Sequence, residues 1–217
     1  MDFIKEFISS LQKGDHHRCF VLLENHPNIT ILENNEVSLI LKCLQFNQFE
    51  MAELVARKKK EINLFEAAAL GISLKIKAFI EKGENPNSVN NEGMTPLGLA
   101  CFYGQYEAVK WLITLGADVN KPMENGLGTY PLHLAVMANS MSIVKFLLEK
   151  GAFINAQEND GTTALYAAVY QRNFEITRFL IEQRAAINIQ LENKVSLREL
   201  VANLQSKEFD TLFKSII

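Results

Sequence analysis

Two histidines and one cysteine stand close together near the start of the chain, and imidazole and thiolate groups are common ligands of zinc. They are His16, His17 and Cys19. A structural zinc site needs four ligands, and no fourth ligand follows these three at a recognised spacing. We therefore interpret them as ordinary helix residues and predict no metal site.

The other residues that could carry catalysis are isolated from one another. The sequence contains no His-Glu-x-x-His, Cys-x-x-Cys, Walker or Gly-x-Ser-x-Gly motif. Cys43 and Cys101 fall at apolar positions of expected helices, so we expect small core residues rather than nucleophiles. His26 precedes Pro27 and marks a helix end. These observations predict that the protein is not an enzyme and uses no cofactor.

The composition is that of a globular protein, because 48% of the 217 residues are hydrophobic and 22% are charged. The net charge of -3 gives no general electrostatic case for nucleic-acid binding. No apolar run approaches the roughly 20 residues of a membrane span. Charges also interrupt the apolar pattern of residues 1–8, so we expect no signal peptide. Three scattered cysteines indicate reduced thiols. We expect a cytoplasmic protein, monomeric by itself, with no nucleic-acid or membrane partner.

The elements that must position these residues are short helices, because apolar residues recur at helical spacing in paired segments. The residues that close the second segments, Gly83, Gly116, Gly151 and Arg184, are 33, 35 and 33 positions apart. The longer interval contains two extra residues in the loop 121–128. An internal repeat of this length predicts an array of helix–turn–helix units, and we count seven of them.

The repeat is less regular towards the N-terminus. His26 and Lys59 are 33 positions apart, but Lys59 and Gly83 are only 24 apart. A connecting loop has therefore been shortened near residues 59–62, which predicts a missing hairpin and an altered stacking angle. The basic run 58–60 follows an expected helix, and cations at that end complement the helix dipole. We favour this interpretation over a nuclear-import or phosphate-binding patch.

The clear units carry residues that explain where their helices begin and end. Thr95 can cap a helix with its hydroxyl group, and Pro96 suits the first helical position. Gly104 and Gly116 permit the left-handed backbone found at helix ends. The aliphatic residues of the second helices, such as Leu112, are expected to be buried against neighbouring units, since no unit can bury its apolar face by itself.

A set of motifs recurs at this period. They are Thr95-Pro96-Leu97, Gly104, Gly116-Ala117-Asp118-Val119-Asn120, Pro131-Leu132-His133-Leu134-Ala135 and Gly151-Ala152. Together they resemble the ankyrin repeat. The match is good over residues 61–190, and it rests on spacing and apolar pattern over 1–60 and 191–217. The resemblance implies an all-α solenoid of helix–turn–helix units with short hairpin loops, in a single array over 1–217 with divergent ends as caps. It also implies a structural hydrogen bond for His133.

Four positions depart from the family pattern. Asn139 and Arg172 replace the glycine between the helices, and asparagine tolerates left-handed backbone better than arginine. Arg184 replaces the glycine of the second turn, and Ala164 replaces the proline. We expect these changes to weaken the third clear unit locally without changing its fold.

The resemblance implies a protein partner, which would bind the concave face formed by the first helices and the hairpin tips. Phe102, Met137 and Tyr170 hold equivalent places near the ends of three first helices, so we expect a row with Tyr103 beside it. The scaffold does not need large apolar residues there, and such residues are enriched in interfaces. The alternative is that they pack against their neighbours. The candidate contact residues are Asn91, Glu92, Met94, Phe102, Tyr103, Leu127, Thr129, Met137, Asn159, Asp160, Thr162, Tyr170 and Gln171.

The class of binding protein stays open at this point. An adaptor or regulator, an inhibitor such as an immunity or antitoxin-like protein, and a pathogen effector are all compatible with the sequence. A different class is an enzyme or small-ligand protein with a pocket at the irregular junction 58–63. A deep pocket lined by convergent polar groups would favour that class, whereas an open concave groove would favour recognition of a protein.

Overall fold

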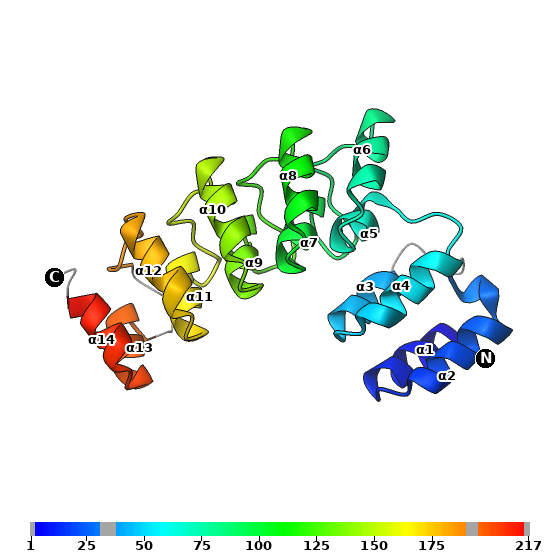
Figure 1. The fold of residues 1–217 in the computed structure, drawn as a ribbon, viewed down its shortest axis with the longest axis horizontal. Helices are drawn as coiled ribbons and strands as arrows, with labels where there is room; N and C mark the ends of the chain where they lie inside the picture. Colours follow the sequence, from blue (N-terminus) through cyan, green and yellow to red (C-terminus); the bar gives the residue numbers. More distant parts are fainter. Residues whose placement is uncertain (1–2, 31–37, 190–194, 215–217) are drawn as a thin grey trace.

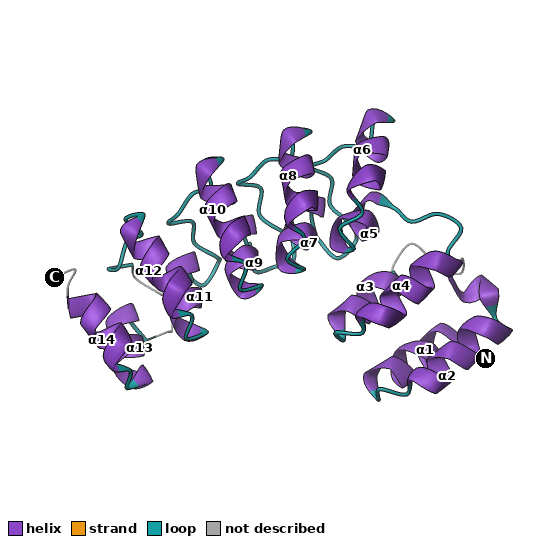
Figure 2. Cartoon of the chain, in the orientation of Figure 1, coloured by secondary structure: helices purple, strands orange, loops and turns teal. Residues whose placement is uncertain are grey.

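A computed structural model describes residues 3–30, 38–189 and 195–214. In these ranges the chain forms fourteen α-helices and no strand, together with a short 3-10 helix at Pro27–Thr30 (Figure 2). The first helices of the pairs are α1 (Phe3–Gln12), α3 (Leu39–Gln45), α5 (Leu64–Ala69), α7 (Pro96–Phe102), α9 (Pro131–Met137), α11 (Ala164–Tyr170) and α13 (Leu197–Leu204). The second helices are α2 (His16–Asn25), α4 (Phe49–Lys58), α6 (Ser73–Glu81), α8 (Tyr106–Thr114), α10 (Met141–Glu149), α12 (Phe174–Glu182) and α14 (Lys207–Lys214). The all-α prediction is confirmed, and the helices form seven pairs.

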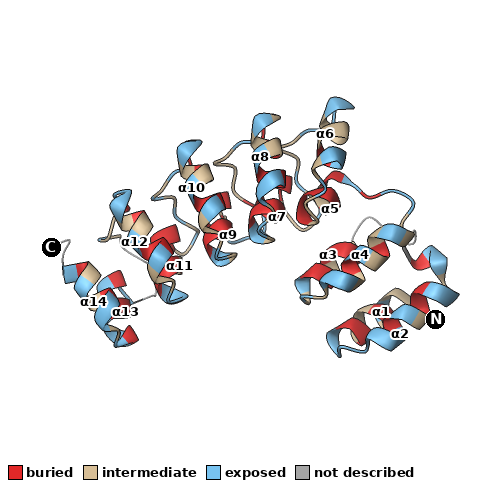
Figure 3. Ribbon diagram, viewed as in Figure 1, coloured by how far each residue is buried: buried red, intermediate tan, exposed pale blue. Residues whose placement is uncertain are grey.

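The pairs follow one another along an arch (Figure 1). The first helices α5, α7 and α9 lie on its inner side, and the second helices α6, α8 and α10 lie on its outer side. The buried residues lie mainly where neighbouring helices face one another (Figure 3). Alanines at one equivalent position of four first helices are completely buried, which lets these helices approach closely. They are Ala67, Ala100, Ala135 and Ala168.

The helix ends form as the sequence predicts. The Thr95 hydroxyl accepts a hydrogen bond from the Gly98 amide at 2.9 Å, and Pro96 begins α7. In the third clear unit, Thr163 caps α11 in the same way even though Ala164 replaces the proline. Asn139 and Arg172 adopt the left-handed backbone, with φ of 53° and 58°, so these replacements preserve the turn.

Asparagines connect successive units on the side of the loops that follow the second helices. The Asn87 side chain donates to the Gly116 carbonyl at 2.9 Å and accepts from the Asp118 amide at 2.7 Å. Asn120 makes the same two bonds to Gly151 and Phe153 in the next unit. These bonds satisfy loop backbone groups and fix the distance between units.

The N-terminal pairs join the array differently. Only five residues, 59–63, separate α4 from α5, and no hairpin lies between them. In Figure 1 the α3–α4 pair is inclined to the α5–α6 pair and does not continue the upright row. The predicted change of stacking angle is confirmed. Lys58 lies in the last turn of α4, as the dipole interpretation expects, and it also forms an ion pair with Glu24 at 2.7 Å.

One buried carboxylate connects the elements at this joint. Glu66 is completely buried, and its Oε1 accepts hydrogen bonds from Ser38 Oγ and Lys59 Nζ, each at 2.7 Å. Its Oε2 accepts from the Asn63 amide at 2.9 Å, while the Asn63 side chain caps α5 by accepting from the Glu66 amide. Ser38 caps α3 in turn. A single side chain therefore holds α3, the linker and α5 together.

Replacement of this carboxylate by an amide tests its role. We expect Glu66→Gln to lower the free energy of unfolding by about 2–4 kcal/mol, because a buried amide cannot form the ion pair that the Glu66 carboxylate makes with Lys59. The control is Glu92→Gln, which removes a half-exposed carboxylate 3.2 Å from Lys42 and should cost about 0–1 kcal/mol. Chemical denaturation of both variants measures the difference. Equal costs would show that the buried carboxylate is not the main connection at the joint.

Candidate functional site

Three large apolar side chains are exposed at the last residue of three consecutive first helices. Phe102, Met137 and Tyr170 end α7, α9 and α11 and are 39%, 46% and 70% exposed. Because α7 packs on α9 and α9 packs on α11, these positions form a row. The other residues of these helices are buried except Ala167, which is half-buried. The row therefore supplies most of the exposed apolar surface of the inner helices in these units.

Two predicted residues border the row. Tyr103 follows Phe102 and is half-buried, with its ring edge-on to the Phe102 ring at 5.1 Å between centroids. Burial and the nearby Glu92 charge raise the pKa of the Tyr103 phenol to about 12, so it remains a neutral hydroxyl group at physiological pH. Gln171 follows Tyr170 and is exposed. The border of the row is thus polar and uncharged at these positions.

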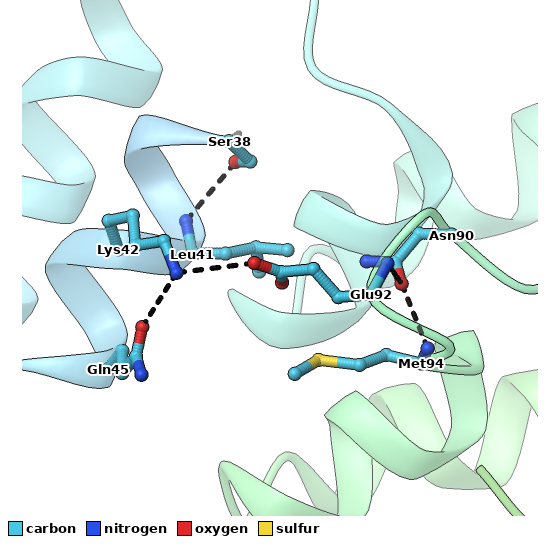
Figure 4. A network of polar contacts seen from close by, with 7 residues as sticks. All are labelled: Ser38, Leu41, Lys42, Gln45, Asn90, Glu92 and Met94. Atoms are coloured by element: carbon cyan, nitrogen blue, oxygen red, sulfur yellow. Dashed lines mark hydrogen bonds and ion pairs between the residues drawn. The ribbon is translucent and has the colours of Figure 1, made fainter. Parts of the chain in front are cut away.

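The first hairpin precedes α7 and contains three of the predicted contact residues. Asn91 is exposed, whereas Glu92 and Met94 are half-buried. The Asn90 side chain shapes the hairpin by accepting hydrogen bonds from the Glu92 and Met94 amides (Figure 4). Glu92 points across to α3, where it pairs with Lys42 at 3.2 Å (Figure 4). Glu92 thus also holds the hairpin against the N-terminal pairs.

The prediction that Thr129 and Thr162 lie at a contact surface is wrong. Their exposed fractions are only 3% and 7%, because each residue lies between the hairpin and the following helix. The Thr162 carbonyl accepts a hydrogen bond from His133 Nε2 at 3.1 Å, which confirms the structural role expected for His133. Leu127, at the tip of the longer loop, is 58% exposed and remains a candidate.

The third hairpin is connected to the second through Asn159. Its side-chain amide donates to the Gly126 carbonyl at 2.8 Å, and its backbone amide donates to the Leu127 carbonyl at 2.9 Å. Asp160 accepts from the Thr162 amide at 3.0 Å. Asn159 is exposed and Asp160 half-buried, so both reach the surface while they also order the hairpins.

The hairpins and the row lie at opposite ends of the first helices. Hairpin residues precede the helices, and row residues end them. A seven-residue helix is about 10 Å long, so the two groups form parallel strips roughly that far apart. A molecule that contacts both strips must lie across the inner helices.

The two histidines and the cysteine near the N-terminus do not come together at one site. His16 and His17 are exposed on α2, whereas Cys19 is completely buried and its Sγ donates to the Phe7 carbonyl at 3.8 Å. Cys43 and Cys101 are also completely buried, which confirms the prediction that they are core residues. Burial raises the pKa of the Cys101 thiol and thereby disfavours the thiolate.

A cleft of about 370 Å³ lies at the irregular junction, where the sequence suggested an alternative site. Its walls come from the end of α4, the linker and the start of α6. Its apolar side chains are Ala56, Ile62, Leu70 and Ile72. The residues of this cleft were not among the predicted contact residues, although the irregular spacing indicated their location.

Close approach of the first two hairpins gives a test of their geometry. Gly93 has a φ of 72°, and a Cβ atom there would lie 2.3 Å from the Glu124 carbonyl oxygen. Gly126 has a φ of 82° with open space around it, so it is a matched control. We expect Gly126→Ala to cost about 1–2 kcal/mol of stability from backbone strain. Gly93→Ala should cost about 1–3 kcal/mol more from the clash. Thermal denaturation measures the stability of both variants, and equal stabilities would contradict this packing.

His133 predicts a dependence of stability on pH. Burial lowers the pKa of His133 below the usual 6.5. Smaller effects raise this pKa, and the largest of them is the nearby Glu158 charge. The unfolded chain therefore binds more protons than the folded one just below pH 6.5. We expect the free energy of unfolding to be constant above about pH 6.5 and to fall as the pH drops below it. His133→Gln keeps a donor for Thr162 and should flatten this slope, whereas His17→Gln should not. A slope unchanged by His133→Gln would contradict the assignment.

No helix in the described part of the chain is long and apolar enough to cross a membrane. A search of curated proteins gave no significant match. The family model for ankyrin repeats (3 copies) matches residues 7–123 and 121–192, which together cover most of the chain. With this match and the stacked helix pairs, the chain belongs to the ankyrin-repeat family.

Proposed function

We propose that this chain binds a protein partner through its concave face and hairpins and catalyses no reaction. Ankyrin repeats are generally protein–protein interaction modules. In the proposal, residues 1–217 act as a single array, with the terminal pairs as caps, inside the cell. The chain would serve as an adaptor, a regulator or an inhibitor, according to what it binds.

The row Phe102, Met137 and Tyr170 carries this proposal. The alternative was that these side chains pack against their neighbours, but all three keep more than a third of their surface exposed. Aromatic residues and methionine are enriched at the centres of protein interfaces. The fold itself gains little from large apolar groups that remain in water.

The polar strip of hairpins supplies the second part of the proposed surface. Leu127 is its exposed apolar residue, and Asn91 and Asn159 are exposed amides beside it. Hydrogen bonds between neighbouring hairpins fix their backbones before any partner arrives. A surface that is already ordered loses little conformational entropy on binding, which favours affinity.

The decisive experiment removes the two aromatic rings of the row together. The tagged full chain is used to purify a partner from the native host, and the affinity of the purified partner is then measured. We expect Phe102→Ala with Tyr170→Ala to weaken binding by at least about 2 kcal/mol, roughly 30-fold, as for central interface residues.

The control removes two aromatic rings of similar exposure elsewhere. Phe49 on α4 and Phe153 after α10 are 51% and 63% exposed. Phe49→Ala with Phe153→Ala should leave the affinity unchanged. If the double variant of the row folds and binds like the wild type, the proposal fails.

A further inference from the structure

At the junction cleft, the start of α6 reverses the polarity that the starts of α4, α8, α10 and α12 share at two positions. Position by position, the start of α6 can be compared with the starts of the other second helices. The residue just before α6 is Ile72, whereas its equivalents before α4, α8, α10 and α12 are Gln48, Gln105, Ser140 and Asn173. The second residue of α6 is Leu74, whereas its equivalents are Glu50, Glu107, Ser142 and Glu175.

The next position shows the opposite change. Lys75 is the exposed third residue of α6, whereas Ala108, Ile143 and Ile176 at the same position are buried. In the later units this position packs within the stack. Because α4 is inclined away at the joint, Lys75 is left at the cleft. The change to lysine is therefore explained by the missing neighbour, but the changes to isoleucine and leucine are not.

The two apolar replacements leave apolar surface in water. Ile72 occupies the N-cap of α6, where of the equivalent residues Asn173 alone makes a side-chain cap bond, and it is 37% exposed. Leu74 is 83% exposed, the largest value among the exposed large apolar residues of the described chain. Ile72 lines the cleft together with Ile62 and Leu70, and these three side chains form its apolar wall with Ala56.

Cations border this apolar wall. Lys60 and Lys75 line the cleft, and neither forms an ion pair with a residue that the structure describes. Of the other lining cations, Arg57 pairs with Glu53 at 3.2 Å and Lys59 pairs with Glu66. Glu61 is the one lining carboxylate outside these pairs, so two ammonium groups face a single opposing charge.

We propose that this cleft is a second binding site, for a small anion with an apolar tail, such as an aliphatic carboxylate. The tail contacts Ile62, Leu70 and Ile72, and the anionic group lies near Lys60 and Lys75. The volume of about 370 Å³ is within the range of small-molecule sites. This site is separate from the proposed protein-binding row, and it does not depend on that function.

The probe is octanoate, an anion with an eight-carbon tail. Octyltrimethylammonium is the control ligand, because it carries a tail of the same length on a cationic head group. Each is titrated into the full-length protein, and amide chemical shifts are followed by NMR. We expect saturable binding of octanoate with shift changes at residues 60–62 and 70–75, and binding of the cation at least tenfold weaker. Ile72→Gln introduces the residue that stands at this position before α4 and α8, so the fold should tolerate it. It should weaken octanoate binding by about tenfold, from lost apolar contact.

Phe153→Gln is the control, since it places the same amide at an exposed apolar position far along the array. It should bind octanoate like the wild type. Should Ile72→Gln fail to fold, Lys75→Gln provides the second variant and should also weaken octanoate binding. The proposal is overturned by an absence of saturable octanoate binding, by equal binding of the cation, or by cleft variants that bind like the wild type.

Discussion

The buried carboxylate of Glu66 is the interaction on which the shape of this protein depends. The regular units are connected through hairpins and asparagine bridges, and the joint between the α3–α4 and α5–α6 pairs lacks that hairpin. Glu66 on α5 connects the elements there by accepting hydrogen bonds from Ser38 at the start of α3 and from Lys59 and Asn63 in the linker. The desolvation of a carboxylate is costly, and here three donors, one of them the paired ammonium group of Lys59, offset it. Its position therefore fixes how the N-terminal pairs sit against the rest.

This joint shapes the cleft and the first hairpin. Inclination of α3–α4 opens the cleft between α4 and α6, and it also brings Lys42 within reach of Glu92 on the first hairpin. Leu70 in the cleft occupies the position that Tyr103 holds beside the row. The row of first-helix ends thus leads along one edge of the array towards the cleft. The two surfaces are neighbours in the fold, but they differ in chemistry: one is aromatic with polar borders, and the other is aliphatic with ammonium groups.

Much of this arrangement could be predicted from the sequence, because the repeat fixes which residues are equivalent. The helix pairs, the caps at Thr95 and Pro96, the buried cysteines and the exposure of the row all follow from periodicity and local preferences. Contacts between hairpins could not be predicted in this way. Thr129 and Thr162 resemble surface residues in sequence, yet both are buried next to their hairpins. Glu92 forms an ion pair with Lys42, which is 50 positions away in the sequence.

Two further signals in the sequence correspond to features of the structure. Asn87, Asn120 and Asn155 recur at the intervals of the repeat, which marks the bridges between units. Ile72 and Leu74 stand where the other units carry polar residues, which marks the cleft. Neither signal has a meaning until the structure shows which neighbour each position faces. At the cleft, the inclination of the α3–α4 pair determines which neighbours these positions face. That inclination depends on the long-range hydrogen bond from Ser38 to Glu66.

The central claim is that a protein partner covers the inner ends of the first helices. Hydrogen–deuterium exchange of the full chain with and without the purified partner tests it most directly. We expect added protection at residues 102–103, 137–138 and 170–171 and in the hairpins, with little change along α8, α10 and α12. Protection confined to those outer helices, with the row unchanged, would contradict it.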